Sequence, residues 1–379
     1  MIRILKTPTL AAGLAALLLA MTPLAAAQDG PRVEMQWRST KFSSYLWIVD
    51  RLAKGDEAYL KVWTASSPLN PQDRNQLERY LEIYGLVAKT AGDAPLEPAL
   101  LSTEPTHGDR FLIAGLAASS SRDFANRLRL KPNEGQALDK VFNHFKARLE
   151  KFVAKAEYLP VAHQQFQSQG DKSKASSFLG RAAEFFGSRD RLQGPLTIDI
   201  VYAPDGIKLK AHQIGSHVVF PCAPAFASSK EQPKAMGALM HEACHFLVSC
   251  LSKKSRQAVE SKLLARLGVI NPRHPNVLEE ATCTALGNIV FMREAYDKEP
   301  LPSVFYPYQP GAEHPHAIDT LARRLEFAAG RGLGRAKSFE GNYLTQALAT
   351  QALLLPARPR HFSRLAKIFW EDQAFSEPY

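Results

Sequence analysis

Two histidines and a glutamate lie inside one strongly apolar stretch of the chain. Residues 234–252 read KAMGALMHEACHFLVSCLS, so a helix formed there would be apolar or small on every side, as in a protein interior. Burying His241, Glu242 and His245 there would cost several kcal/mol unless they have partners. His241 and His245 are one helical turn apart and can reach one point beside the helix, and Glu242 can reach a water held there. This H-E-x-x-H spacing predicts a zinc site.

A catalytic zinc ion has three protein ligands and keeps one position for water. Glu279 and Glu280 lie near the start of a second apolar stretch, and either could supply the third ligand beside His241 and His245. We therefore expect one Zn²⁺ per chain. Bound zinc lowers the pKa of its water to around 7, and Glu242 would take a proton from that water and pass it to a leaving amine.

A further side chain commonly shares the negative charge that develops on the carbonyl oxygen. Tyr306, Tyr308, His314 and His316 follow the second apolar stretch, and the sequence does not choose among them. The predicted activity is hydrolysis of an amide bond, with a peptide or protein as substrate.

Two segments just before the metal-binding helix are typical of strands. Residues 196–202 read LTIDIVY and residues 214–220 read IGSHVVF, with the turn residues Pro204-Asp205-Gly206 between them. We expect these segments to form a small antiparallel unit, with His217 on its outward face, which is favoured over the alternative that it faces a cleft.

The rest of the chain reads as mainly helical. Asn70 and Pro71 indicate a capped helix start, and apolar stripes at helical spacing mark residues 138–158 and 173–187. We expect an α+β fold that is mostly α-helical, with a helical region at 28–194 and a catalytic domain at 195–379. Within that domain, helices are expected at 255–267, 277–295, 315–329, 343–355 and 362–369.

The first 27 residues have the pattern of a secretory signal peptide. Arg3 and Lys6 precede an apolar run from Leu10 to Met21, and three alanines at 25–27 offer a cleavage site. The apolar run is short for a membrane span, which favours cleavage over an uncleaved anchor. We expect an exported protein, periplasmic or secreted, without a transmembrane anchor.

The charge pattern indicates a solvated surface. The 379 residues carry a net charge of +10, or roughly +8 once the signal is removed, and the basic residues are dispersed in short groups. No nucleic-acid-binding module accompanies them, so no nucleic-acid partner is expected. Weak attraction to anionic envelopes or polymers is equally compatible, and nothing indicates the oligomeric state.

Four cysteines, Cys222, Cys244, Cys250 and Cys283, lie within one third of the chain. An even number in an exported protein allows two disulfides, with three connectivities. Cys244 and Cys283 could bridge the two apolar helices, although four buried thiols are an equal alternative. A zinc site made of cysteines alone is not expected, because there is no C-x-x-C pair.

The stretch from about Leu196 to Leu325 resembles the gluzincin zinc metallopeptidases. SHVVF, MHEACHFL and VLEEATCTALGN match the strand beside the active site, the HExxH helix and the helix with the ligand glutamate. The later HPHAIDTLARRL resembles a helix start of the compact, membrane-associated and periplasmic members. The resemblance covers about a third of the chain. It implies zinc held by the two histidines and a glutamate, Glu242 as general base, and a strand at 216–220 that holds an extended peptide.

The match departs from one common gluzincin pattern and fits another. Gluzincins often have an aspartate four residues after the ligand glutamate, but here Cys283 and Thr284 lie at that distance from Glu279 and Glu280. Other members have a polar residue, the ligand glutamate and a small residue three further on. That version favours Glu280 as the ligand, with Glu279 beside it or as the alternative.

Two other functions remain open beside an exported zinc endopeptidase. One is an inactive member retained as a peptide- or envelope-binding protein, which the complete H-E-x-x-H motif disfavours. The other is a structural zinc site, in which Cys244 or Cys250 would close the fourth position.

Overall fold

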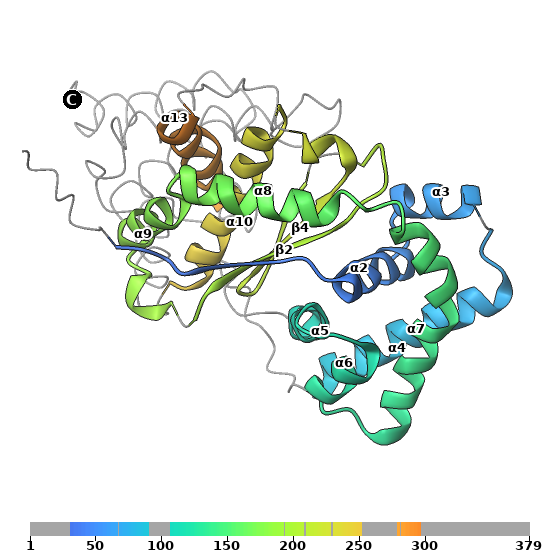
Figure 1. Cartoon of the computed structure of the whole chain (residues 1–379). Coiled ribbons are helices and arrows are strands. Elements are labelled where there is room, and N and C mark those ends of the chain that lie inside the picture. The colour runs from blue at the N-terminus through green and yellow to red at the C-terminus, as the bar shows by residue number, and fades with distance from the viewer. Residues whose placement is uncertain are drawn as a thin grey trace, which may run out of the picture.

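The computed structural model describes residues 31–296 except 67, 91–106, 193, 208–209, 229, 252–278 and 281 (Figure 1). The predicted signal segment, the helix expected at 255–267 and the helices expected beyond residue 297 lie outside these residues. So do the four candidate oxyanion donors, Tyr306, Tyr308, His314 and His316.

The described part of the chain confirms a mostly helical α+β fold built round a small mixed sheet. The strands are β1 (Met35–Arg38), β2 (Leu196–Tyr202), β3 (His212–Ile214) and β4 (His217–Cys222), in the order β1-β2-β4-β3. β2 pairs in parallel with both β1 and β4, and β3 pairs antiparallel with β4.

The first predicted strand, 196–202, is confirmed as β2, but the second, 214–220, is divided by a turn between β3 and β4, and the expected antiparallel pairing is wrong. Gly215, with φ of 57°, and Ser216 form a two-residue turn inside the segment that was read as one strand. This turn folds β3 back on β4, with Ile214 opposite His217. Every residue of β2 is buried, as is usual for a parallel strand covered on both faces.

β1 was not predicted, because MQWR is too short to show a periodic pattern. Its pairing partner is distant in sequence, with Met35 opposite Leu196. The sheet therefore contains a strand from the region that was expected to be helical throughout.

The predicted helix start at Pro71 is confirmed. The Asn70 side chain accepts a hydrogen bond from the Asp73 backbone at 2.8 Å, and the Asp73 carboxylate accepts one from the Asn70 backbone at 3.0 Å. The α-helices are α2 (Lys41–Ala53), α3 (Glu57–Ser66), α4 (Pro71–Thr90), α5 (His107–Leu116), α6 (Ser121–Arg127), α7 (Pro132–Val153), α8 (Leu159–Lys172), α9 (Ala175–Phe186), α10 (Gln232–Ser249) and α13 (Phe291–Tyr296). Shorter turns are η1 (Arg189–Arg191), η2 (Pro224–Ala227) and the π-helix η3 (Thr284–Val290).

Helices cover both faces of the sheet (Figure 1). On one face Trp47 of α2 packs on His212, which lies opposite Val219 of β4. The next residue of β4, Phe220, points to the other face and packs on Phe166 of α8. α10 also contacts β3 and β4, so the sheet supports the helix that carries the H-E-x-x-H motif.

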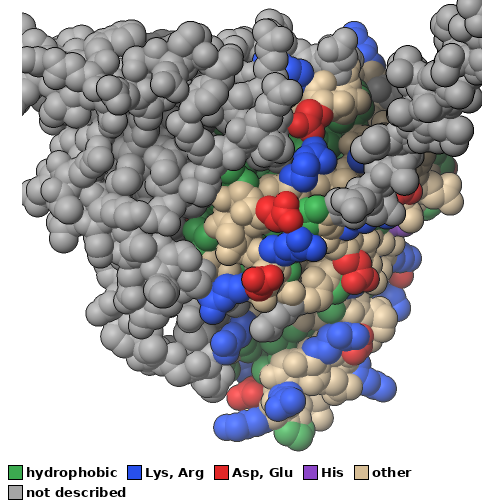
Figure 2. Space-filling view, turned by 90° about the vertical axis from the view of Figure 1, so that its left-hand side faces the viewer, with side chains coloured by type: hydrophobic (Ala, Val, Ile, Leu, Met, Phe, Trp, Pro, Cys, Tyr) green, Lys and Arg blue, Asp and Glu red, His purple; other side chains and the backbone are tan. Residues whose placement is uncertain are grey.

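The surface agrees with the dispersed charge read from the sequence. Figure 2 shows basic and acidic side chains interspersed on the face that it displays. Glu184 of α9 pairs with Arg189 of η1 at 2.7 Å, and Arg181 of α9 pairs with Glu294 of α13. Among the described residues, no helix is long and apolar enough to span a membrane.

Candidate metal centre

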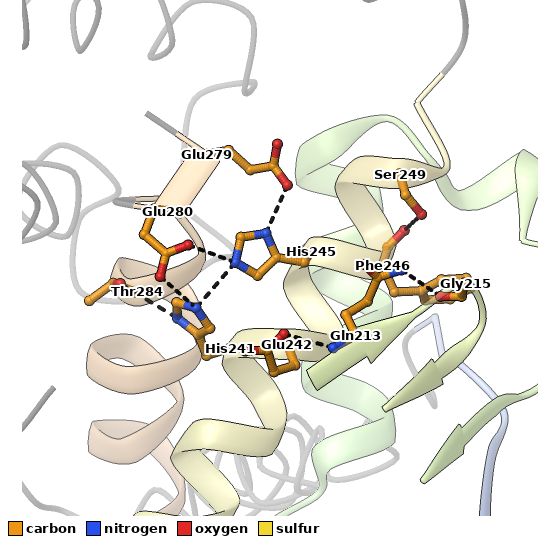
Figure 3. Close-up of polar contacts among 10 residues, drawn as sticks. All are labelled: Gln213, Gly215, His241, Glu242, His245, Phe246, Ser249, Glu279, Glu280 and Thr284. Carbon is orange, nitrogen blue, oxygen red and sulfur yellow. Dashed lines mark hydrogen bonds and ion pairs between the residues drawn. The ribbon is translucent and has the colours of Figure 1, made fainter. Parts of the chain in front are cut away.

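α10 confirms the predicted buried helix. Its residues are buried on nearly all sides, and Pro233 stands in its first turn. His241 is only 8% exposed, whereas Glu242 and His245 are partly exposed. Figure 3 shows both imidazoles directed toward Glu280, while Glu242 lies on the side of the helix that faces β3.

The second apolar stretch packs directly against α10. Glu279 and Glu280 are helical, and the chain continues through the π-helix η3 into α13. Gly287 of η3 lies so close that a Cβ there would come 2.2 Å from the backbone nitrogen of His241. π-Helical turns are rare and frequently occur at functional sites. Here the backbone of the π-helix η3 meets the backbone of α10 beside His241.

Three side chains that could bind a metal ion meet between these helices. The two Nε2 atoms of His241 and His245 are 3.1 Å apart. Glu280 places Oε1 3.2 Å from the first and Oε2 3.1 Å from the second. Ligands at the usual zinc distances would be about 3.3 Å apart in a tetrahedral site. The donor set therefore fits zinc in both chemistry and spacing.

Glu279 has a different place. Its Oε1 lies 2.7 Å from Nδ1 of His245, the ring nitrogen that faces away from the ligand cluster. A carboxylate in that position holds the imidazole in the tautomer that presents Nε2 to a metal. The geometry thus puts Glu280 among the ligand atoms and Glu279 behind His245.

His241 has its own support from η3. Its Nδ1 lies 3.5 Å from the hydroxyl of Thr284 and 3.4 Å from Nδ2 of Asn288. Oδ1 of Asn288 is buried and makes no hydrogen bond within the described part of the chain. A metal on Nε2 requires a proton on Nδ1, and that proton needs an acceptor. Turning the Asn288 amide, whose two ends are assigned rather than observed, would pair Oδ1 with this proton.

The charges of the centre are strongly coupled. Burial opposes protonation of His245, but Cys283 and the carboxylates of Glu279 and Glu280 outweigh it and hold the imidazole pKa well above its ordinary value. Burial also opposes ionisation of Glu280, but the hydrogen bonds and charges of His241 and His245 hold its pKa well below the usual range. The carboxylates thus favour positive charge on the His245 imidazole, and a divalent cation would supply that charge.

Glu242 is held by the sheet. Its Oε2 accepts a hydrogen bond of 2.9 Å from the backbone N–H of Gln213 in β3 (Figure 3). The strand that lies beside the motif helix is therefore β3, which is one of the two edges of the sheet that the described strands form. The expectation that 216–220 holds an extended peptide is not met, because His217 to Val219 already pair with β2 and β3.

No disulfide joins the four cysteines in the structure. Cys222, Cys244 and Cys283 are buried and Cys250 is partly buried. This agrees with the predicted alternative of buried thiols and not with two disulfides. Burial raises the pKa of Cys222 and, against the nearby His245, that of Cys283 to about 12. Such thiols are unreactive, and no cysteine joins the ligand group among the residues described.

His217 is buried, so its expected outward position is wrong. Its Nδ1 lies 2.5 Å from a carboxylate oxygen of Asp199 on β2, and Arg38 of β1 approaches the other oxygen at 3.7 Å. These contacts link three strands on the face covered by α2 and α5. The prediction failed because it assumed a two-stranded unit with one open face.

Four residues of the centre were missed from the sequence: Gln213, Thr284, Gly287 and Asn288. A signal existed for two of them. Thr284 and Asn288 follow Glu280 at intervals of four, which places one polar stripe on an otherwise apolar helix. Gln213 had no signal, because its contribution is a backbone N–H.

In comparisons with family models, curated proteins and solved structures, nothing matched this chain. The functional proposal below therefore depends on the geometry of the centre and on the motif resemblance.

Proposed function

We propose that this chain is a zinc-dependent peptidase with one zinc ion, held by His241, His245 and Glu280. The observation that carries the proposal is the meeting of these three ligand atoms, all within 4.8 Å of one another, with the carboxylate of Glu242 on the same helix. The three atoms lie between two buried helices, so their positions are set by packing and not by mobile side chains.

Each residue would have a separate role in the proposed reaction. Zinc in such a site lowers the pKa of a coordinated water to about 7 and polarises a carbonyl group. Glu242 has one oxygen on the Gln213 N–H, and the other, Oε1, is left for proton transfer as far as the described residues show. Oε1 would accept the proton of the attacking water and then deliver it to the leaving amine. Glu279 and Asn288 would keep the two imidazoles oriented.

A structural zinc site is less well supported. Such a site closes its fourth position with a protein ligand. The ligand group of the described residues has three members, and neither Cys244 nor Cys250 belongs to it. Glu242 and His245 also remain partly exposed, which suits a site that a substrate must reach.

The proposal includes export and a peptide or protein substrate. Export is inferred from the charged, apolar and alanine-rich segments of residues 1–27. An inactive binding protein stays an alternative, and the complete set of His241, Glu242 and His245 favours the enzyme. No nucleic-acid partner is proposed, because basic and acidic side chains are interspersed on the displayed face (Figure 2).

The test compares the unmodified protein with Glu242→Gln. Both should carry about one zinc per chain by elemental analysis, because Glu242 is not among the ligand atoms. The variant should lose roughly 100-fold or more of its activity on fluorescein-labelled casein. Glu184→Gln, an exposed change on α9, should match the unmodified protein in both measurements.

Two outcomes would contradict the proposal separately. Protein that stays zinc-free in zinc-replete medium would remove the metal site. Zinc-loaded Glu242→Gln with full activity would leave the metal site in place and refute the role of Glu242.

A further inference from the structure

β3 is the edge of the sheet nearest to the proposed active site. It has three residues and pairs with β4 alone among the described strands. An edge strand carries backbone N–H and C=O groups that no neighbouring strand satisfies, and these groups are a template for another extended chain.

The register shows which residue of β3 faces outward. Gln213 lies opposite Val218, and its N–H points to Glu242 of α10 and not to β4. In an antiparallel pair, a residue's N–H and C=O point to the same side. The N–H and C=O of Gln213 are therefore the outward pair of this edge, and one residue of an extended peptide could bridge them with two hydrogen bonds.

Glu242 already occupies the donor of that pair. Its Oε2 takes the Gln213 N–H at 2.9 Å, and a hydrogen bond to an ionised carboxylate is stronger than one to a neutral carbonyl. The Gln213 side chain does not compete for the same groups, because its Nε2 donates to the Gly215 carbonyl at 2.6 Å. A peptide that pairs with β3 must displace this carboxylate.

We propose that an extended polypeptide binds to the outward edge of β3 at Gln213 and that its carbonyl replaces Glu242 as acceptor of the Gln213 N–H. Binding of the polypeptide and release of the Glu242 carboxylate from the Gln213 N–H are then one event. Without a polypeptide, the sheet holds Glu242; with one, both oxygens of Glu242 are free for the site. This inference builds on the proposed function by naming how substrate binding would free the base.

Two variants that cannot hydrolyse peptides test the competition between Glu242 and a polypeptide for the Gln213 N–H. Glu242→Gln keeps an acceptor oxygen for the Gln213 N–H, whereas Glu242→Ala has none. With zinc bound, both should be unable to hydrolyse the probe, which is fluorescein-labelled, dephosphorylated casein, an unfolded polypeptide. We expect Glu242→Ala to bind this casein roughly three- to tenfold more tightly than Glu242→Gln in fluorescence anisotropy, since one competing hydrogen bond is removed.

Gln213→Pro, combined with the two Glu242 variants, completes a double-mutant cycle. Proline removes the N–H in question, and an edge strand tolerates it because that N–H does not serve the sheet. In the Gln213→Pro background, casein should bind more weakly and the difference between the two Glu242 variants should vanish. Gln213→Ala keeps the N–H and should preserve the difference. Zinc content and thermal unfolding check that each variant is folded.

The outcomes separate this inference from the proposed function. Equal casein affinities for Glu242→Ala and Glu242→Gln would overturn it, and so would a difference that persists with Gln213→Pro. The cycle measures binding alone, so it remains decisive if the unmodified protein proves not to hydrolyse casein. If the casein affinities differ as expected but the unmodified protein does not hydrolyse casein, β3 would remain a polypeptide-binding edge and the peptidase proposal would be rejected.

Discussion

At the level of single residues, three carboxylates of the centre differ in the atoms they face. Glu280 faces both Nε2 atoms of the histidine pair, Glu279 faces Nδ1 of His245, and Glu242 faces a backbone N–H of β3. The chemical group is the same in each case. The position round its helix decides whether it would bind a metal, orient a ligand or transfer a proton.

The two neighbouring glutamates should differ in their effect on zinc. Glu280→Gln removes a ligand charge, and we expect zinc affinity to fall by more than about 100-fold. Glu279→Gln removes only the partner of His245 Nδ1, so a fall of about 10- to 100-fold is expected. Competition with a chromophoric chelator measures both. Glu294→Gln on α13 is the control, because its partner is Arg181; a larger loss in Glu279→Gln would reverse the assignment.

The sequence predicted the motif residues but could not separate Glu279 from Glu280 by spacing alone. The two side chains point about 100° apart round a helix, so the ligand depends on how the second helix is rotated against α10. That rotation is set by packing, notably where Gly287 meets His241. Only the motif resemblance favoured Glu280 in advance.

At the level of elements, the centre depends on the close contact between α10 and η3. The absence of a side chain at Gly287 allows the two backbones to approach, and the neighbouring Asn288 then reaches Nδ1 of His241. Separating the helices would move Glu280 away from both imidazoles.

Gly287→Ala should therefore damage both stability and metal binding. The added Cβ would lie 2.2 Å from the backbone of His241, which cannot move aside as a flexible side chain would. We expect a loss of about 1–3 kcal/mol in unfolding free energy and weaker zinc binding. Gly85→Ala in α4 is the matched control, since nothing lies within 4 Å of its Cβ and helix propensity favours alanine. Unchanged zinc affinity in Gly287→Ala would refute the role of this contact.

The elements differ in how far the sequence could predict them. The apolar run of α10 and the cap of α4 are local patterns, and both were predicted. β1 and the parallel pairing of β2 depend on contacts between residues far apart in sequence, such as Met35 with Leu196. The turn at Gly215 was overlooked because the residues on both sides of it favour strands.

At the level of the whole molecule, the sheet joins the metal centre to the helices of the N-terminal region. α2 packs on β2, and α4 and α7 pack beyond it (Figure 1). Buried residues of all these elements belong to one hydrophobic core, whose members span the described chain from Val33 to Met292. A change far from the centre should therefore weaken the fold that holds the proposed zinc ligands.

Asp73 of α4 offers such a change. Its carboxylate is buried and accepts hydrogen bonds from the Asn70 backbone and from Arg148 of α7, and it lies 2.7 Å from Nε2 of His144. Burial raises its pKa, but the hydrogen bonds from Arg148, Asn70 and His144 outweigh burial and lower the pKa to about 2. Because the folded pKa lies below the unfolded value of about 3.9, the ionised carboxylate stabilises the fold above pH 4. This contribution is lost as the pH falls toward 2.

Asp73→Asn should thus cost about 1–3 kcal/mol of unfolding free energy at pH 7, and its difference from the unmodified protein should shrink between pH 4 and pH 2. Urea unfolding followed by circular dichroism measures this, with the exposed Asp171→Asn on α8 as control. Because the core is continuous, release of zinc to a chelator dye at pH 7 should shift to lower urea together with the circular dichroism transition. Zinc release that stays at its original urea concentration would show that the metal centre unfolds independently of α4 and α7.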